Sequence, residues 1–193
     1  MKVAFDENMP AAMVRILRGF HAERGLRTLV AGISIVRAQD YYPGKTDADF
    51  GLKDDSPWIR RFAADGGRVV VSGDTRMMKK PHERLALIEA GLTTIFFPNP
   101  WHGWKFCQKC ALLMHWWPTI IATVKKPEPG FFMVQKSWPD YGEAKLRTLP
   151  IGDLNMTKVA RQLAERDVVR AARLRKRDER AAKGDLLNEK PET

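Results

Sequence analysis

The sequence has few cysteines and no long hydrophobic run. Among 193 residues there are 2 cysteines. No apolar run approaches the roughly 18 residues of a transmembrane helix, so we expect no membrane association. The chain reaches the acid Asp6 without the charged-then-apolar pattern of a secretory signal, so we expect no export. With so little cysteine and no export signal, we expect no disulfide bond and a reducing, cytoplasmic setting.

Charge is plentiful and unbalanced. The chain has 33 Lys and Arg against 23 Asp and Glu, a net charge of +10. A basic excess on a chain of this size favours polyanionic partners, with nucleic acid as the first candidate. The alternative is a basic protein without such a partner. Residues 156–193 hold 11 Lys and Arg against 7 Asp and Glu, so +4 of the +10 lies there.

Short apolar segments alternate with amphipathic segments over the first half of the chain. Apolar and β-branched runs predict strands at residues 2–5, 32–36, 68–72 and 93–97. Helical spacing of apolar residues, with proline at the start and glycine at the end, predicts helices at 10–24, 57–65 and 81–90. This alternation predicts an α/β fold, a three-layer α/β/α arrangement with a central, mainly parallel sheet that is complete by about residue 98.

The remaining segments have weaker patterns. They predict, in chain order, a polar loop at 41–55, a helix at 104–117, an added edge strand at 131–135 and a charged C-terminal helix at 156–183. The last ten residues are expected to be disordered. We therefore expect a main domain over residues 1–137, followed over 138–193 by a linker and a basic helical tail.

Acidic side chains follow two of the predicted strands. Asp6 and Glu7 come directly after the first strand, Asp74 follows the third, and Asp54 and Asp55 lie in the loop before the second predicted helix. In a parallel sheet the carboxyl ends of the strands share one edge, where ligands gather. Carboxylates that converge there repel one another unless a cation neutralises them, and Mg²⁺ or Mn²⁺ suits such oxygen ligands. The alternative for each acid alone is a helix cap or a turn residue.

Four segments resemble the PIN-like domain family. The opening KVAFDENMP resembles the "DEN-x-P" start of these domains. The segment DDSPWIRRFAADGGRVVVSGDTRM resembles their middle, where an acid precedes a helix and a strand ends in "S/T-x-D". The segments KKPHERLALIEAGLTTIFF and WWPTI most resemble the VapC45-like branch of PIN toxins. The resemblance spans about residues 2–135.

The resemblance implies a metal-dependent ribonuclease, typically the toxin of a prokaryotic toxin–antitoxin pair. Its cofactor would be Mg²⁺ or Mn²⁺ and its substrate RNA. Carried over by position, Asp6, Asp55 and Asp74 are the catalytic and metal-binding acids, with Asp54 as the close rival of Asp55 and Glu7 as a supporting metal ligand. A cognate antitoxin protein is the expected partner, and a homo-oligomer is left open.

Basic residues near these acids are candidates for substrate binding. Many PIN-like relatives place a further acid two residues after the third one, where this chain has Arg76. Arg76 could instead hold the scissile phosphate, because guanidinium pairs well with phosphate oxygens; the alternative is a surface arginine. Lys79 and Lys80 are further expected substrate contacts, since basic residues position the RNA backbone without selecting its sequence. Asn8, in the opening motif, is another expected substrate contact.

Other features allow different interpretations. Cys107 and Cys110, with His102 and His115 nearby, allow a zinc site, but their helical spacing favours ordinary packing. The tryptophans of the same region could stack RNA bases, but packing on the sheet or a partner surface is favoured; they are Trp101, Trp104, Trp116 and Trp117. The basic tail is either a solvated helix face or a docking site for a partner or RNA.

Three rival functions stay open. A non-catalytic RNA-binding or regulatory module would use the acids only structurally. A receiver-type phosphoacceptor domain also gathers acids at strand ends, but Asp74 lacks the expected surroundings. A haloacid-dehalogenase-like phosphatase requires D-x-D after its first strand, and the second of these positions is Asn8 in this chain.

Overall fold

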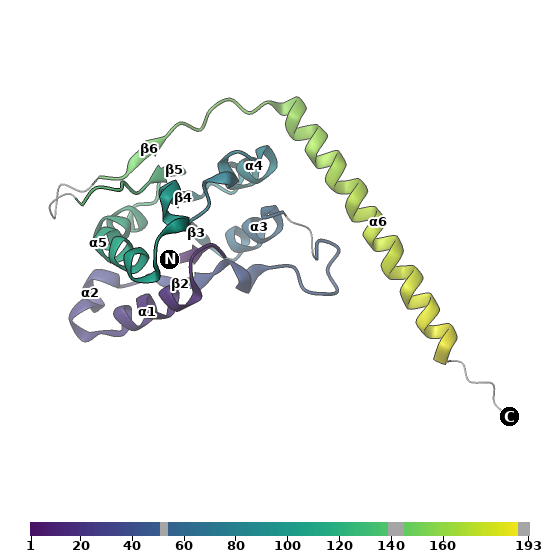
Figure 1. Ribbon diagram of the computed structural model, residues 1–193, viewed down its shortest axis with the longest axis horizontal. Coiled ribbons are helices and arrows are strands. Elements are labelled where there is room, and N and C mark those ends of the chain that lie inside the picture. Colours follow the sequence, from purple (N-terminus) through teal and green to yellow (C-terminus); the bar gives the residue numbers. More distant parts are fainter. Residues whose placement is uncertain (51–53, 139–144, 189–193) are drawn as a thin grey trace.

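The computed structural model describes residues 1–50, 54–138 and 145–188 of the chain. Its described part contains one sheet with the strand order β2-β1-β3-β4-β5-β6 (Figure 1). The strands are β1 (Lys2–Phe5), β2 (Ser34–Arg37), β3 (Gly67–Ser72), β4 (Thr93–Phe96), β5 (Gly130–Met133) and β6 (Arg147–Leu149). The pairs from β2 to β5 are parallel and β6 is antiparallel to β5. The predicted mainly parallel sheet is therefore confirmed.

Helices cover both faces of this sheet. The helices on one face are α1 (Ala11–Ala22), α2 (Arg27–Val30) and α5 (Phe106–Lys125), and those on the other are α3 (Ser56–Ala64) and α4 (Pro81–Glu89). Val69 and Val71 belong to the first core, while Val70 belongs to the second. This division follows from the strand itself, whose successive side chains point to opposite faces. The predicted α/β/α layers are confirmed.

The sheet extends further than the sequence predicts. It does not end near residue 98, because β5 and β6 continue it. The expected edge strand at 131–135 is also not at the edge. β6 pairs with β5, with Phe131 opposite Leu149, and takes the edge position. An antiparallel pair of this kind needs no crossover helix, so no helical pattern in the sequence announces it.

Helix α5 is longer than predicted. The expected helix ends at residue 117, but α5 continues through Pro118 to Lys125. Ile120, Ile121 and Val124 extend its buried face, and their burial outweighs the hydrogen bond that proline removes. The preference for packing is confirmed for the four tryptophans, since Trp101, Trp116 and Trp117 are buried in the core and Trp104 packs against it partly buried. Cys110 packs partly against the same core, whereas Cys107 is exposed, so packing does not account for Cys107.

Short 3₁₀ helices follow three strands at the carboxyl edge. They are η2 (Ala38–Tyr41), η3 (Thr75–Met78) and η4 (Asn99–Gly103), and a fourth, η1 (Arg24–Leu26), precedes α2. Residues 42–50 and 54–55 are in neither helix nor strand. The predicted loop at 41–55 is therefore confirmed from residue 42 over the described positions, and residues 51–53 lie outside them.

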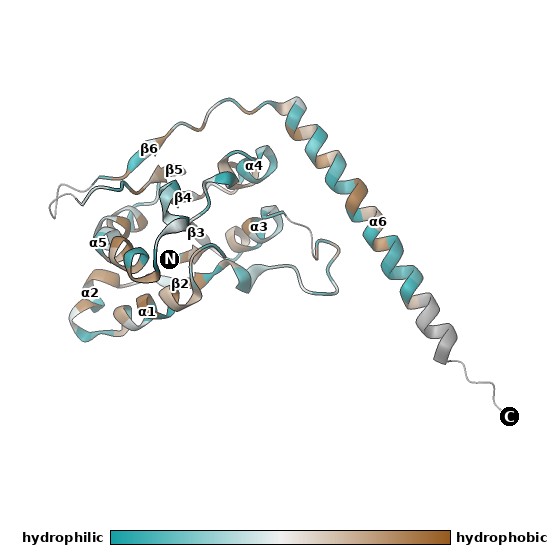
Figure 2. Ribbon diagram, viewed as in Figure 1, coloured by the Kyte–Doolittle hydropathy of each residue, from teal (hydrophilic) through white to brown (hydrophobic). Residues whose placement is uncertain are grey.

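Helix α6 (Met156–Asn188) is long and largely hydrophilic (Figure 2). It contacts α4 and then extends past the domain (Figure 1). The division at residue 137 stays a prediction, and β6 lies beyond it. Of the ten residues predicted to be disordered, 184–188 are helical in α6 and 189–193 lie outside the described part. Within the described residues, no helix has both the length and the apolar character needed to cross a bilayer.

Candidate active site

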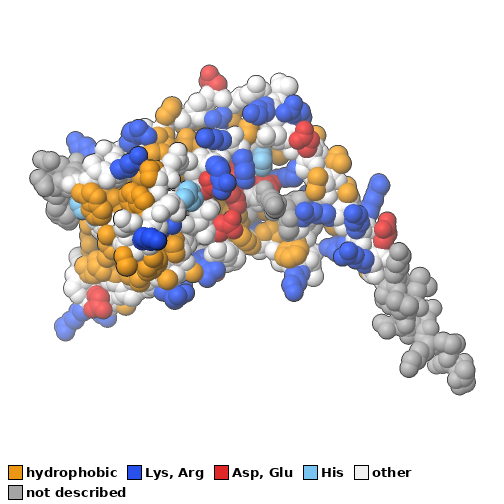
Figure 3. All heavy atoms as spheres, viewed as in Figure 1, with side chains coloured by type: hydrophobic (Ala, Val, Ile, Leu, Met, Phe, Trp, Pro, Cys, Tyr) orange, Lys and Arg blue, Asp and Glu red, His pale blue; other side chains and the backbone are white. Residues whose placement is uncertain are grey.

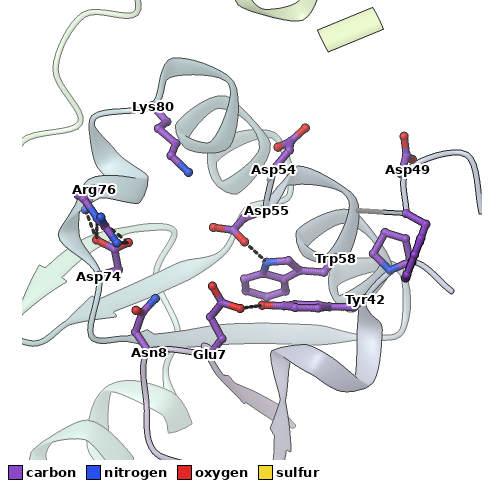
Figure 4. Close-up of a pocket in the computed structure, with 12 residues that line it drawn as sticks. Glu7, Asn8, Tyr42, Asp49, Asp54, Asp55, Trp58, Asp74, Arg76 and Lys80 are labelled. Carbon is purple, nitrogen blue, oxygen red and sulfur yellow. Dashed lines mark hydrogen bonds and ion pairs between the residues drawn. The ribbon is translucent and has the colours of Figure 1, made fainter. Parts of the chain in front are cut away.

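The candidate site lies at the carboxyl ends of β1 and β3, which are parallel neighbours. Asp6, Glu7 and Asn8 follow β1, Asp74 follows β3, and Asp55 is the residue before α3. A cleft of about 500 Å³ opens here (Figure 4). Its walls are formed by Glu7, Asn8, Tyr42, Pro43, Asp49, Phe50, Asp54, Asp55, Trp58, Asp74, Arg76 and Lys80. The acids that the sequence places at one sheet edge therefore do lie there.

Asp6 is buried beneath the wall of this cleft. Asn8 lines the cleft and donates to Asp6 Oδ1 from its backbone N (3.0 Å) and from Nδ2 (3.2 Å). The Ser72 hydroxyl donates to Asp6 Oδ2. Burial raises the pKa of Asp6, and these hydrogen bonds offset that rise only in part. Asn8, a residue of the cleft wall, thus contacts both carboxylate oxygens of Asp6.

Asp74 is held by the residue that replaces the fourth acid. Arg76 donates from Nε to both carboxylate oxygens (2.9 and 3.0 Å) and from its backbone N to Oδ1 (2.8 Å). Burial raises the pKa of Asp74, but the hydrogen bonds and charge of Arg76 outweigh it and leave that pKa below its usual value. The residue before Asp74 must be glycine, because a Cβ at Gly73 would lie only 2.9 Å from Trp101 Nε1. The Arg76 side chain is 70% exposed, so it is free to meet a ligand as well.

Glu7 and Asp55 face the same space (Figure 4). Trp58 Nε1 donates to Asp55 Oδ1 (3.0 Å), and the Tyr42 hydroxyl donates to Glu7 Oε2 (3.0 Å). Burial raises the pKa of Asp55 more than the Trp58 bond lowers it. Burial, followed by the charges of Glu7 and Asp55, also raises the pKa of Tyr42, which therefore stays a donor. Two fixed aromatic donors thus orient two carboxylates.

Asp54, the rival of Asp55, points away from that space (Figure 4). Its Oδ1 accepts from the Ser56 backbone N (2.9 Å) and lies 3.4 Å from His82 Nε2. Its Oδ2 accepts from Arg166 Nη1 (2.9 Å), and the Asp54 side chain is only 5% exposed. Burial alone would raise the pKa of Asp54, but the bonds from His82, Ser56 and Arg166 together hold it far below the usual range. Asp54 therefore anchors α6, while Asp55 faces the cleft.

Helix α6 docks along the loop that carries these acids. Gln162 contacts His82 Nδ1 (3.1 Å), and Arg170 pairs with Asp49 (3.3 Å). Two further arginines donate to backbone carbonyls: Arg173 Nη1 to Phe50 O (3.3 Å) and Arg177 Nη1 to Thr46 O (2.9 Å). Arginines three and four residues apart share one helix face. This face of the basic tail is therefore used within the chain.

Glu83 is an acid of the site that the sequence reasoning missed. It lies in the first turn of α4 and is fully buried. Its Oε1 accepts from Lys80 Nζ (2.7 Å) and from the Asp55 backbone N (3.4 Å), while Oε2 has no hydrogen-bond partner among the described residues. Burial raises the pKa of Glu83 to about 7 despite Lys80. The sequence does place Glu83 in the first turn of the helix that follows β3, and this turn lies at the same sheet edge. Acids are common in first helical turns, however, so this position alone does not identify Glu83 as a site residue.

Asp54, His82 and Glu83 also lie close enough together to hold a metal ion. Their partners argue against that use. Arg166 already binds Asp54 and Lys80 already binds Glu83. The hydrogen bond with Asp54 raises the pKa of His82, which favours the protonated imidazole that cannot ligate. This cluster is better described as an ion-pair network.

The charge balance of the main cleft suits a divalent cation. Five carboxylates line it, those of Glu7, Asp49, Asp54, Asp55 and Asp74, and two more, Asp6 and Glu83, lie behind its wall and contact lining residues. Among the described residues, four cations contact these acids: Arg76 at Asp74, Lys80 at Glu83, Arg166 at Asp54 and Arg170 at Asp49. Seven negative charges less four positive ones leave three formal negative charges, with histidine counted as neutral. The neighbouring acids add to the raised pKa values of Asp6, Asp55 and Glu83. Oxygen donors with surplus negative charge are the ligands that Mg²⁺ and Mn²⁺ prefer, so these residues fit such an ion.

Comparison with known families matches the part of the chain that carries these acids. The family described as "PIN like domain" matches residues 1–99 of the 193. The match covers β1 to β4 and every acid named at the cleft, and leaves α5, β5, β6 and α6 outside it. No curated protein and no solved structure matches the chain. The chain belongs to the PIN-like domain family, whose members are generally nucleases that use divalent metals.

Proposed function

We propose that this protein is a metal-dependent endoribonuclease that hydrolyses RNA phosphodiesters in the main cleft. The observation that carries the proposal is the surplus of three formal negative charges at one sheet edge, left by seven carboxylates and the four cations that contact them. Exposed basic residues beside an acidic, oxygen-lined cleft suit a phosphodiester together with a divalent cation. Figure 3 shows Lys and Arg side chains next to Asp and Glu side chains at the centre of this face.

Asp6, Asp55 and Asp74 are the proposed metal-binding and catalytic acids, with Glu7 as a further ligand and Asn8 as a substrate contact. When bound, Mg²⁺ or Mn²⁺ supplies Lewis acidity toward water and phosphate oxygens. Trp58 holds Asp55 in place through the bond to its carboxylate. Because Asn8 and Arg76 contact the oxygens of Asp6 and Asp74, both side chains must yield part of these contacts when the acids bind an ion.

The basic residues position the substrate. Arg76 has a guanidinium that can exchange Asp74 for phosphate, because its side chain is 70% exposed. Lys80 lines the cleft, and its hydrogen bond to Glu83 holds the ammonium group in one position. Lys79 lies in a neighbouring cleft rather than in the main one. These charges stabilise the phosphate that gains negative charge during hydrolysis.

The proposed biological role is that of a toxin in a prokaryotic toxin–antitoxin pair. It rests on the resemblance of KKPHERLALIEAGLTTIFF and WWPTI to the VapC45-like branch. A cognate antitoxin is the proposed partner and the cytoplasm the proposed location, because the RNA substrates lie there. A small overlapping gene for a DNA-binding antitoxin beside this one is expected. An isolated gene whose induction leaves growth unchanged would contradict the toxin role without affecting the ribonuclease proposal.

A second candidate is an RNA-binding module without catalysis. The observation in its favour is that Arg76 and Asn8 already occupy oxygens of Asp74 and Asp6. Such a module would bind RNA with or without a divalent cation. It would leave the RNA intact, and alanine at Asp6 or Asp74 would not weaken binding.

The deciding experiment is RNA cleavage by the purified protein. We expect cleavage with Mg²⁺ or Mn²⁺ and none with EDTA. Asp55→Asn and Asp74→Asn should abolish it, while Asp178→Asn, a change of the same kind at an exposed position of α6, should not. Cleavage by Asp6→Ala and Asp74→Ala at the wild-type rate would show that the site assignment is wrong.

A further inference from the structure

A second cleft of about 350 Å³ adjoins the main one. Its walls are formed by Asp74, Thr75, Arg76, Lys79, Asn99 and His102. Asp74 and Arg76 belong to both clefts, so the two meet at this ion pair. The second cleft lies between η3 and η4, the segments that follow the neighbouring parallel strands β3 and β4. It therefore continues the same sheet edge.

The walls of this second cleft are held in place by one contact between them and by contacts to the core and to α5. The Thr75 hydroxyl donates to Asn99 Oδ1 (2.6 Å) and so joins η3 to η4. Trp101 is fully buried behind Gly73 and fixes η4 against the core. Lys109 Nζ donates to the His102 carbonyl (3.4 Å) from the side of α5. The cleft is thus formed by the fold before any ligand arrives, which lowers the entropic cost of binding.

The charge of the second cleft is opposite to that of the main cleft. Arg76 and Lys79 are cationic, and the exposed His102 adds an imidazole. The acid in its wall, Asp74, is already bound by Arg76. A cationic cleft thus lies directly beside an anionic one, with Arg76 at their junction. This pattern suits a strand of nucleic acid, because the phosphates beside the scissile one are neutralised by Lys and Arg side chains rather than by the metal ion.

We propose that the second cleft binds the phosphate next to the scissile phosphate of single-stranded RNA. Lys79 and His102 contact that phosphate, and Asn99 offers its amide group. The strand then runs from the acids of the main cleft across Arg76 into the second cleft. This inference rests on the proposed function, since it takes the main cleft as the place of cleavage. Contacts of this kind set register and affinity and leave sequence choice to other residues.

The test is the binding of short fluorescent oligouridylates in EDTA, where no cleavage occurs. The variant is Lys79→Gln/His102→Gln, in which both positions are exposed. The matched control is Arg68→Gln/Lys126→Gln, which removes exposed charge in β3 and directly after α5. Equal melting temperatures for both variants and the wild type would show that the fold is intact.

In EDTA the acidic main cleft has no cation to hold a phosphate, so we expect the second cleft to bind a phosphate of a dinucleotide and of a trinucleotide alike. The Lys79→Gln/His102→Gln variant should bind both more weakly, and the salt dependence of its affinity should fall by about 0.7 in slope, which corresponds to a loss of about fivefold at 0.1 M salt. The control should keep the wild-type affinity and slope. A variant that keeps both would overturn the proposal. If the wild-type protein does not cut RNA but the salt-dependence slopes of wild type and variant still differ, the ribonuclease proposal is wrong and the second-cleft proposal stands. If the wild-type protein cuts RNA and the variant binds RNA as the control does, the second-cleft proposal is wrong and the ribonuclease proposal stands.

Discussion

Replacing Arg166 with alanine is the sharpest perturbation of the way α6 is joined to the site. Arg166 Nη1 lies 2.9 Å from Asp54 Oδ2, and the two side chains are 17% and 5% exposed. The two residues are 112 positions apart in the sequence. The change leaves a buried carboxylate without its cation, directly beside Asp55. It therefore tests both the docking of α6 and the assignment of Asp54 as an anchor.

The magnitude follows from the partners that remain. Breaking a buried ion pair by removing one partner costs about 3–5 kcal/mol. Asp54 would keep the Ser56 backbone N and His82, and Arg166 reaches some solvent, so we expect about 2–3 kcal/mol. At roughly 2–4 °C per kcal/mol for a chain of this size, the melting temperature should fall by roughly 4–12 °C.

The assay is thermal unfolding followed by circular dichroism, with limited proteolysis to report release of α6. Arg161→Ala is the matched control, because the Arg161 side chain is 72% exposed and, among the residues that the structure describes, pairs only with exposed Glu165 within its own helix. It should leave the melting temperature unchanged. Asp54→Asn combined with Arg166→Ala should cost clearly less than the sum of the single changes, because the two residues share one interaction.

The pH dependence supplies a further check. The pKa of Asp54 is lowered in the folded protein, so its contribution is fully present above the unfolded value of about 3.9 and is lost as pH falls through the folded value. The difference between wild type and Arg166→Ala should therefore be full at neutral pH and shrink below about pH 4. A melting temperature equal to that of Arg161→Ala, or full additivity with Asp54→Asn, would refute the anchoring role.

Three other predictions concern the site and the core. Asp55→Asn should raise the melting temperature of the metal-free protein, because it removes a buried carboxyl group whose pKa is raised in the folded state. The same change should abolish the stabilisation that Mg²⁺ gives the wild-type protein, which is about 2.7 kcal/mol when the free ion is at a hundredfold excess over its Kd. Burial raises the pKa of Glu83 to about 7, so the contribution of Glu83 to stability in EDTA should be fully present below its unfolded value near 4.3 and be lost as pH rises through about 7. Glu83→Gln should flatten this decline, and an unchanged profile would contradict the shift. Gly67→Ala should cost about 1–3 kcal/mol in urea unfolding, because its Cβ would lie 2.4 Å from the Phe62 ring in a filled core, and a neutral result would mean that the ring can move.

The sequence predicts the parts of the fold that local patterns encode. Continuous apolar runs specify β1, β3 and β4, and the acids after β1 and β3 follow because parallel strands end at one edge. β5 and β6 pair through a contact without a helical crossover, and neither strand has a strong pattern of its own. The docking of α6 depends on arginines that meet backbone carbonyls far away in the chain. The sequence does not reveal which residues accept these hydrogen bonds, because every residue has a backbone carbonyl.

Asp54 and Asp55 show where prediction of the site stops. They are adjacent and chemically identical, and the difference between them is one of direction. Asp55 already has helical backbone angles, and successive helical residues turn by about 100°. Trp58, three residues on, therefore lies on the same face as Asp55 and donates to it. Helix spacing alone thus pairs the tryptophan with the second acid. It does not say which face meets the cleft, because that depends on Lys80 and Glu83 on one side and on Arg166 on the other. The choice between two neighbouring acids is made by residues that fold against them from two other helices.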